Sequence, residues 1–156
     1  MIEPLQNDDE ARACATMMSA SEPWITIGRG FDECLAAIRD PTREVYVVRD
    51  DGALRGFIIL NMRGAFVGYI QTVCVAAEAR GGGVGTALVR FAEERIFRET
   101  PNVFLCVSSF NPRARALYER LGYQTVGELR DYIIRGAAEI LMRKTRGPLR
   151  PVEGTG

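Results

Sequence analysis

The strongest constraint in this sequence is a glycine-rich turn between an expected strand and an expected helix, at residues 73–88, VCVAAEARGGGVGTAL. The start of a helix presents unpaired backbone N–H groups and the positive end of the helix dipole, both of which favour a phosphate group. Glycines remove the side chains that would hold a phosphate away from those amides, here at Gly81, Gly82, Gly83 and Gly85. The turn therefore predicts a phosphate site, with a flexible loop and helix cap as the alternative.

Two well-known glycine loops do not fit this turn. The dinucleotide pattern G-x-G-x-x-G requires a glycine at Thr86 when it starts at Gly81, and one at Leu88 when it starts at Gly83. The ATP-type loop ends in Gly-Lys-Ser/Thr, and the turn contains no lysine. The phosphate is therefore expected to belong to another kind of ligand.

The composition argues against several classes of function. Lys plus Arg equals Asp plus Glu, 20 against 20, whereas a nucleic-acid-binding protein usually has a basic excess. The chain has no histidine, which argues against Ser-His-Asp and Cys-His nucleophiles and most zinc or non-haem iron sites, so no metal site is expected. Neither a signal peptide nor an apolar run of roughly 20 residues is evident, so we expect a cytoplasmic protein without membrane or nucleic-acid partners.

The cysteines lie far apart, without a C-x-x-C spacing and with apolar neighbours. This distribution predicts small buried side chains and neither a disulfide framework nor a metal site. They are Cys14, Cys34, Cys74 and Cys106.

Hydrophobic periodicity and turn residues predict an α/β (α+β) fold, with a mixed, mostly antiparallel sheet of about six or seven strands and helices on both faces. A single domain is expected over residues 1–144, followed by a mobile tail over residues 145–156. Residues 19–30 are expected to form a loop. Strands are expected at residues 1–6, 44–49, 54–62, 66–75, 103–107, 124–134 and 137–143, and helices at residues 8–18, 31–39, 83–98 and 111–120.

Two motifs in this order resemble the GNAT N-acetyltransferase superfamily. Arg80, Gly83 and Gly85 fit its phosphate loop, Gln/Arg-x-x-Gly-x-Gly/Ala. Residues 111–123, NPRARALYERLGY, fit its pattern Asn-x-x-Ala-x-x-(aromatic or aliphatic)-Tyr-x-x-x-Gly-Phe/Tyr. The resemblance covers roughly residues 44–143 and implies the GNAT acyl-CoA N-acyltransferase fold. The first 40 residues, which cover the acceptor site in this family, match nothing specific.

The resemblance also implies where acetyl-CoA, the expected co-substrate, would bind. In the family, the strand matching residues 66–75 carries a bulge and splays from the strand matching residues 103–107, and the pantetheine arm enters the gap. The cofactor-binding residues that this implies are Val73, Cys74, Val75, Arg80, Gly81, Gly82, Gly83, Val84, Gly85, Thr86 and Asn111.

For Tyr118, the resemblance implies a position beside the thioester sulfur, where its hydroxyl would donate a hydrogen bond or a proton to the departing thiolate. The alternative is a packing aromatic, because Tyr118 shares core spacing with Ala114 and Leu121. Tyr118 is the one expected catalytic residue.

The general base and the acceptor are not identified. The C-terminal segment resembles RimI-like N-acetyltransferases, which often carry a glutamate where this chain has Cys106. We therefore expect proton loss through water, with no indispensable base. Trp24, Tyr69, Gln71 and Tyr132 are candidates for the acceptor side.

The expected function is transfer of an acetyl group from acetyl-CoA to a primary amine by direct attack. Both a small-molecule amine and a protein N-terminal amine remain open as acceptors, and both a monomer and a homodimer as assemblies. A covalent route through Cys106 or Cys74 would lack a histidine to activate the thiol. The alternative from another class is a non-catalytic acyl-CoA-binding sensor on the same fold.

Overall fold

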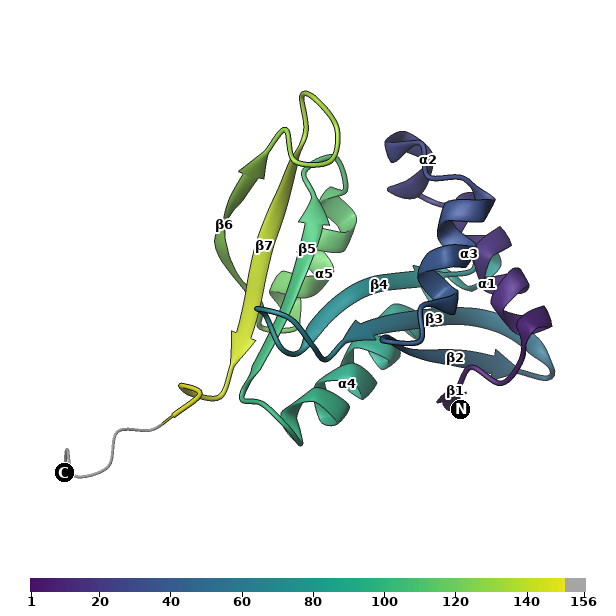
Figure 1. Ribbon diagram of the computed structural model, residues 1–156, viewed down its shortest axis with the longest axis horizontal. Coiled ribbons are helices and arrows are strands. Elements are labelled where there is room, and N and C mark those ends of the chain that lie inside the picture. Colours follow the sequence, from purple (N-terminus) through teal and green to yellow (C-terminus); the bar gives the residue numbers. More distant parts are fainter. Residues whose placement is uncertain (151–156) are drawn as a thin grey trace.

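The computed structural model describes residues 1–150. Its strands and helices alternate along the chain as shown in Figure 1. In order they are β1 (Ile2–Pro4), α1 (Asp8–Ser19), α2 (Trp24–Ile27), α3 (Phe31–Arg39), β2 (Glu44–Asp50), β3 (Ala53–Asn61), β4 (Tyr69–Val75), a 3₁₀ turn (Ala77–Ala79), α4 (Val84–Phe97), β5 (Asn102–Ser108), α5 (Pro112–Arg120), β6 (Gln124–Arg130) and β7 (Ala138–Thr145).

The strands form one seven-stranded sheet in the order β1-β2-β3-β4-β5-β7-β6. Every neighbouring pair is antiparallel except β4 and β5, which are parallel. Helices α1 and α3 cover one face, while α4 and α5 lie on the other (Figure 1). The predicted fold class, a mixed and mostly antiparallel sheet with helices on both faces, is confirmed.

Two hydrophobic cores follow from the alternation of side chains along the strands. In β3, Ile58 belongs to the core under α4 and α5, and the next residue, Ile59, belongs to the core under α1 and α3. Both residues are fully buried, so the middle of β3 separates the two cores.

The local predictions hold for most elements and fail at three. The expected helix at residues 31–39 is α3, but the expected loop at residues 19–30 contains the short helix α2. The expected strand over residues 66–75 begins only at Tyr69, and the one over residues 124–134 ends at Arg130. Left-handed backbone explains both shortened strands, because φ is +87° at Gly68 and +53° at Asp131.

Gly68 fixes the point where β4 meets β5. Its carbonyl accepts a 2.9 Å hydrogen bond from the N–H of Phe104. A Cβ at this position would lie 2.6 Å from the carbonyl oxygen of Asn102 and 2.6 Å from Cγ2 of Ile96. Both the left-handed backbone and the close approach of neighbouring atoms therefore require glycine here.

Strands β4 and β5 separate soon after this point. Their register contains only the pairs Tyr69–Phe104 and Ile70–Leu105. On the other edge of β4, the pairing with β3 shifts and leaves Gln71 as the extra residue of a bulge. Strand β5 instead pairs with β7 along its whole length, so the two halves of the sheet diverge (Figure 1).

The expected tail begins inside the last strand, because Thr145 closes β7. Arg146 also contacts the rest of the chain: its N–H donates a 2.8 Å hydrogen bond to Pro101, and its guanidinium lies 4.0 Å from the ring centroid of Phe97. The part of the expected tail at residues 151–156 lies outside the described residues. No helix within residues 1–150 combines the length and the apolar character that a membrane span requires.

Gly68→Ala should destabilise the fold more than Gly64→Ala. Both glycines have positive φ, but a Cβ at Gly64 meets nothing within 4 Å. The left-handed conformation alone should cost about 1–2 kcal/mol in Gly64→Ala, and overpacking should add about 1–3 kcal/mol in Gly68→Ala. Denaturant unfolding of both variants measures the difference. Equal losses would contradict the close contact around Gly68.

Candidate active site

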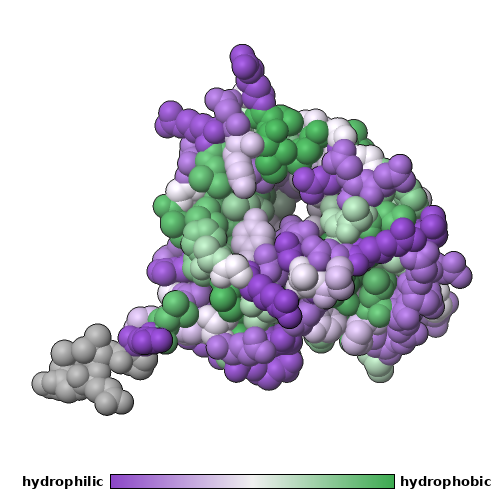
Figure 2. Space-filling model, in the orientation of Figure 1, coloured by the Kyte–Doolittle hydropathy of each residue, from purple (hydrophilic) through white to green (hydrophobic). Residues whose placement is uncertain are grey.

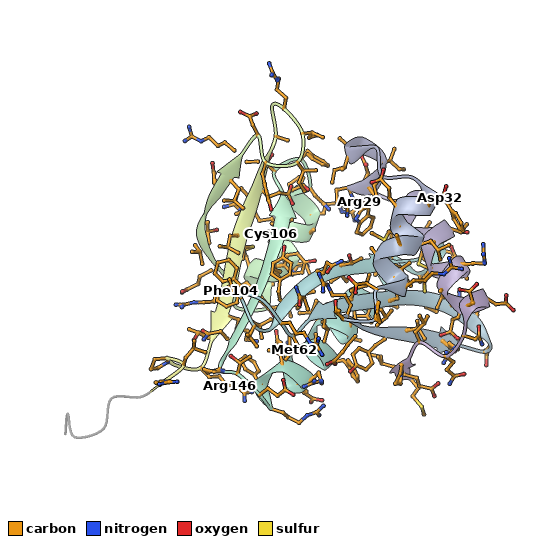
Figure 3. The ribbon with its side chains drawn as sticks, in the orientation of Figure 1. Arg29, Asp32, Met62, Phe104, Cys106 and Arg146 are labelled. Atoms are coloured by element: carbon orange, nitrogen blue, oxygen red, sulfur yellow. The ribbon has the colours of Figure 1, made fainter. Side chains whose placement is uncertain are left out.

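A cleft of about 220 Å³ opens where β4 and β5 diverge. The space-filling view shows the molecule hollowed between its two halves (Figure 2). Cys106 on β5 and Arg29 beside α2 lie on opposite sides of this opening (Figure 3). The residues that line it include Glu22, Trp24, Ile27, Arg29, Tyr69, Gln71, Val73, Cys106, Ser108, Asn111, Ala114, Tyr118, Ile133 and Glu139.

Helix α4 begins without a side-chain cap and without an acidic residue in its first turn. Its N-cap, Gly83, has φ +86°, a left-handed conformation that favours glycine. By contrast, α1 is capped by Asn7, whose Oδ1 accepts a 2.9 Å hydrogen bond from the N–H of Glu10, and its first turn is acidic. The first-turn amides of α4 and the positive end of its dipole are therefore left for an external anion.

The surroundings of this turn leave room for such an anion. A Cβ at Gly81 or Gly83 would meet nothing within 4 Å. A Cβ at Gly85 would lie 3.6 Å from both Val75 and Leu117, so the first turn of α4 sits between the end of β4 and α5. The turn thus follows the strand β4, whose edge borders the cleft. Its residues fit the phosphate group of a ligand whose remaining part lies in the cleft.

Arg80 joins this turn to the segment before α2. Its Nη2 donates a 3.1 Å hydrogen bond to Oγ of Ser21, which in turn donates to the carbonyl of Met17 at 2.7 Å. These two hydrogen bonds connect the glycine turn to the last turn of α1. Ser21 is only 6% exposed, so the contact is shielded from water.

The edge of β4 that faces the cleft has no strand partner beyond Ile70 within residues 1–150. Its other edge is paired with β3, including Val73 with Ile58 and Val75 with Gly56. The Cys74 side chain is buried in the core under α1 and α3, where burial raises its pKa to about 12. Cys74 can therefore serve a ligand only through its main chain, whereas Val73 also lines the cleft.

Tyr118 projects from α5 into the core and borders the cleft. It is 8% exposed and packs edge-on against Tyr123, with ring centroids 6.0 Å apart. Burial raises the pKa of Tyr118 to about 12. Its hydroxyl therefore stays protonated near neutral pH and can act as a hydrogen-bond donor.

Asn111 is placed by the start of α5. As the N-cap residue, its Oδ1 accepts a 3.3 Å hydrogen bond from the N–H of Ala114. Its own N–H donates to the carbonyl of Ser108 at 2.9 Å, which fixes the turn after β5. Asn111 and Tyr118 both line the cleft, and the contact of Asn111 with a cofactor stays a prediction.

The candidates for the acceptor side separate into two groups. Trp24, Tyr69 and Gln71 line the cleft, and Oε1 of Gln71 also accepts a 2.6 Å hydrogen bond from Arg43. Tyr132 is not among the lining residues; it is 63% exposed on the connection between β6 and β7.

Glu139 and Ser108 also lie in the cleft, although the sequence did not indicate either. Glu139 on β7 is opposite Ser108 on β5, whose Oγ donates a 2.7 Å hydrogen bond to Oε2 of Glu139. Burial raises the pKa of Glu139, and the hydrogen bond from Ser108 opposes this. Cys106 is a thiol with a pKa raised by burial, which disfavours the thiolate that a covalent route would need.

Comparison with known proteins adds an independent set of findings. Residues 9–123 match the family described as Acetyltransferase (GNAT) family. An uncharacterized N-acetyltransferase of Methanocaldococcus jannaschii is 36% identical over 110 residues, 67% of this chain and 70% of that protein. Blasticidin-S acetyltransferase of Streptomyces morookaense is 28% identical over 87 residues, 56% of this chain and 63% of that protein. A solved aminoglycoside 6′-N-acetyltransferase complexed with coenzyme A shares the fold, with TM-score 0.77, 20% identity, and coverage of 97% of this chain and 99% of that one.

The raised pKa of Tyr118 predicts a specific alkaline loss of stability. An unfolded tyrosine titrates near pH 10, whereas Tyr118 titrates at about 12 in the folded chain. Between these values the unfolded state binds fewer protons, so stability falls as pH rises. Tyr118→Phe should lose less stability than the wild type between about pH 10 and 12, as measured by denaturant unfolding. Identical pH dependence in both proteins would contradict the burial of this hydroxyl.

Proposed function

Because this chain belongs to the GNAT acetyltransferase family, we propose that it transfers the acetyl group of acetyl-CoA to a primary amine by direct attack. The chain is an acetyltransferase; the donor, the acceptor class and the residue roles are the proposed part. The observation that carries the proposal is the cleft between β4 and β5, which Tyr118 lines, together with the uncapped start of α4, which packs beside the end of β4.

The donor is proposed to lie along β4. The unpaired edge at residues 73–75 fits the amide groups of a pantetheine arm, which can pair with it as a further strand would. The turn at residues 80–86 fits the pyrophosphate, and Asn111 fits a contact to the arm. Bound there, acetyl-CoA would supply an acyl group activated as a thioester. The solved relative in complex with coenzyme A supports this choice of ligand.

Tyr118 is proposed as the donor to the departing sulfur. Its hydroxyl is protonated near neutral pH, burial raises its pKa further, and the residue borders the cleft. Full proton transfer is not required: a thiol titrates near pH 8.5, so the departing thiolate is a weaker base than a tyrosinate and can leave with its negative charge. A hydrogen bond that strengthens as negative charge develops is sufficient.

Direct attack is favoured over an acyl-enzyme intermediate. Burial raises the pKa of both Cys106 and Cys74, and the sequence has no histidine to deprotonate them. The nucleophile is therefore proposed to be the amine itself, entering from the side of α2, where Trp24, Tyr69 and Gln71 line the cleft.

Both acceptor classes stay in the proposal, a small-molecule amine and a protein N-terminal amine. The named relatives, a blasticidin-S acetyltransferase and an aminoglycoside acetyltransferase, support the first class. A panel of small amines and N-terminal peptides, assayed with acetyl-CoA by release of free thiol, tests the activity. Tight binding of acetyl-CoA without thiol release for any acceptor would favour a non-catalytic sensor.

Thr86→Glu should weaken coenzyme A binding while preserving the fold. Thr86 lies in the first turn of α4, where a carboxylate complements the helix dipole and adds about 0.3–1 kcal/mol to the stability of the free protein. The same charge would repel a pyrophosphate. Wild-type protein at about 100 times Kd should gain roughly 2.7 kcal/mol from the ligand, and a tenfold loss of affinity would remove about 1.4 kcal/mol of that gain.

Thr86→Gln is the matched control, because it has nearly the same shape without the charge. Thermal unfolding with and without coenzyme A compares the two variants with the wild type. If Thr86→Glu binds coenzyme A as tightly as Thr86→Gln does, the start of α4 does not hold the phosphates.

Tyr118→Phe should lower kcat by about tenfold to a thousandfold, because it removes one hydrogen bond that develops in the transition state. KM should change less, since the ring and its packing against Tyr123 remain. Steady-state rates, with the chemical step shown to limit turnover, measure the effect. A wild-type kcat in the variant would contradict the proposed role of the hydroxyl.

A further inference from the structure

Glu139 and Tyr118 approach the cleft from opposite faces of the sheet. Alternation along β5 and β7 places Leu105, Val107 and Ile140 in the core under α4 and α5, to which Tyr118 also belongs. Ser108 and Glu139 occupy the intervening positions, so they face the other side, toward α2. Glu139 therefore lies on the side from which the amine is proposed to enter.

The other titratable groups of the cleft are poorly suited to accept a proton at neutral pH. Burial raises the pKa of Tyr69, Cys106 and Tyr118, which keeps all three protonated. Arg29 is a cation. Glu22 also lines the cleft, but its carboxylate already accepts a 2.8 Å hydrogen bond from the N–H of Thr26 in α2.

We propose that Glu139 is the general base of the reaction, accepting a proton from the ammonium group of the acceptor. This inference rests on the proposed function. The ammonium transfers H⁺ to the Glu139 carboxylate, and the freed nitrogen lone pair forms the C–N bond to the acetyl carbon. The C–S bond breaks with its electron pair on sulfur, which receives a hydrogen bond or proton from Tyr118. The second nitrogen proton goes to solvent as the amide forms, or to Tyr118 where that hydroxyl has protonated the sulfur, and Glu139 returns its proton to solvent.

Ser108 acts as a positioning residue in this arrangement. Its hydroxyl holds Oε2 of Glu139 at 2.7 Å, which fixes the carboxyl group and leaves Oε1 for the acceptor. Glu139 is 9% exposed, and this burial moves its pKa upward, toward the range in which a carboxylate is an effective base. The other titratable groups that line the cleft are Cys106 on the neighbouring strand β5, Tyr69, Tyr118, Glu22 and Arg29.

The test compares the pH dependence of kcat/KM in wild-type protein and Glu139→Gln, with two acceptors whose amine pKa values differ by at least about one unit. In the wild type, activity should rise through an inflection that is the same for both acceptors. In Glu139→Gln, kcat/KM near pH 7 should fall by about a hundredfold to ten-thousandfold. The deficit should shrink as the pH approaches the pKa of each amine, because the amine then loses its proton to solvent.

Two companion variants distinguish this role from a structural one. Glu128→Gln, on the exposed strand β6, removes a carboxylate outside the cleft and should leave the profile unchanged. Ser108→Ala removes the hydrogen bond that lowers the pKa of Glu139, so the inflection should move to higher pH with a smaller loss of rate. If Glu139→Gln fails to fold, as judged by thermal unfolding, the shift in Ser108→Ala decides the question.

The failures of the two proposals are separable. A wild-type protein that releases no thiol with any acceptor would refute the proposed acetyl transfer itself. With an active wild type, an unchanged rate in Glu139→Gln would overturn the role of Glu139, as would a deficit that is equal at every pH. A wild-type inflection that follows the pKa of the acceptor would overturn it too, and would favour proton loss through water.

Discussion

The divergence of β4 from β5 is the constraint on which the rest of the site depends. Strand β5 is paired with β7 over its whole length, whereas it meets β4 at only two residue pairs. Before the first pair, the Gly68 carbonyl accepts a hydrogen bond from the N–H of Phe104, and neighbouring atoms pack closely around Gly68. The bulge at Gln71 follows and bends β4 away from β5. The separation leaves a strand edge without a partner among residues 1–150, and such a backbone edge is a binding surface for an extended amide chain.

The same divergence assigns different chemistry to the two faces of the sheet. On one face, α4 and α5 present an uncapped helix start and the Tyr118 hydroxyl, which suit an anionic ligand and a departing thiolate. On the other face, α2 and the start of β7 present aromatic and carboxylate groups, which suit a cationic amine. The Arg80–Ser21 hydrogen bond crosses between these regions, so the glycine turn and the α2 segment are held in a fixed relation.

Within the candidate site, the sequence predicted the local structure of those parts that consecutive residues encode. The turn before α4 and the N-cap at Asn111 depend on backbone conformation within one segment, and both occur where they were expected. Family membership and the fold class were also predicted correctly from such segments. Glu139 was not predicted as a site residue, because its position depends on the register between β5 and β7, which neither strand encodes alone. The sequence also did not predict which core the Cys74 side chain enters, because that depends on the bulge in the pairing of β4 with β3.

A chain without histidine needs another way to supply both an acid and a base near neutral pH, and burial offers one. Removing a group from water disfavours its charged form, so burial raises the pKa of a tyrosine and of a carboxylic acid alike. Tyr118 would be protonated near neutral pH even at the ordinary tyrosine pKa of about 10, and the rise moves the hydroxyl further from ionisation. For Glu139 the rise makes the carboxylate a stronger base, as acceptance of a proton from an ammonium group requires. Burial therefore acts on two groups with different starting pKa values: it makes Glu139 a stronger base, and it keeps the Tyr118 hydroxyl a hydrogen-bond donor over a wider range of pH.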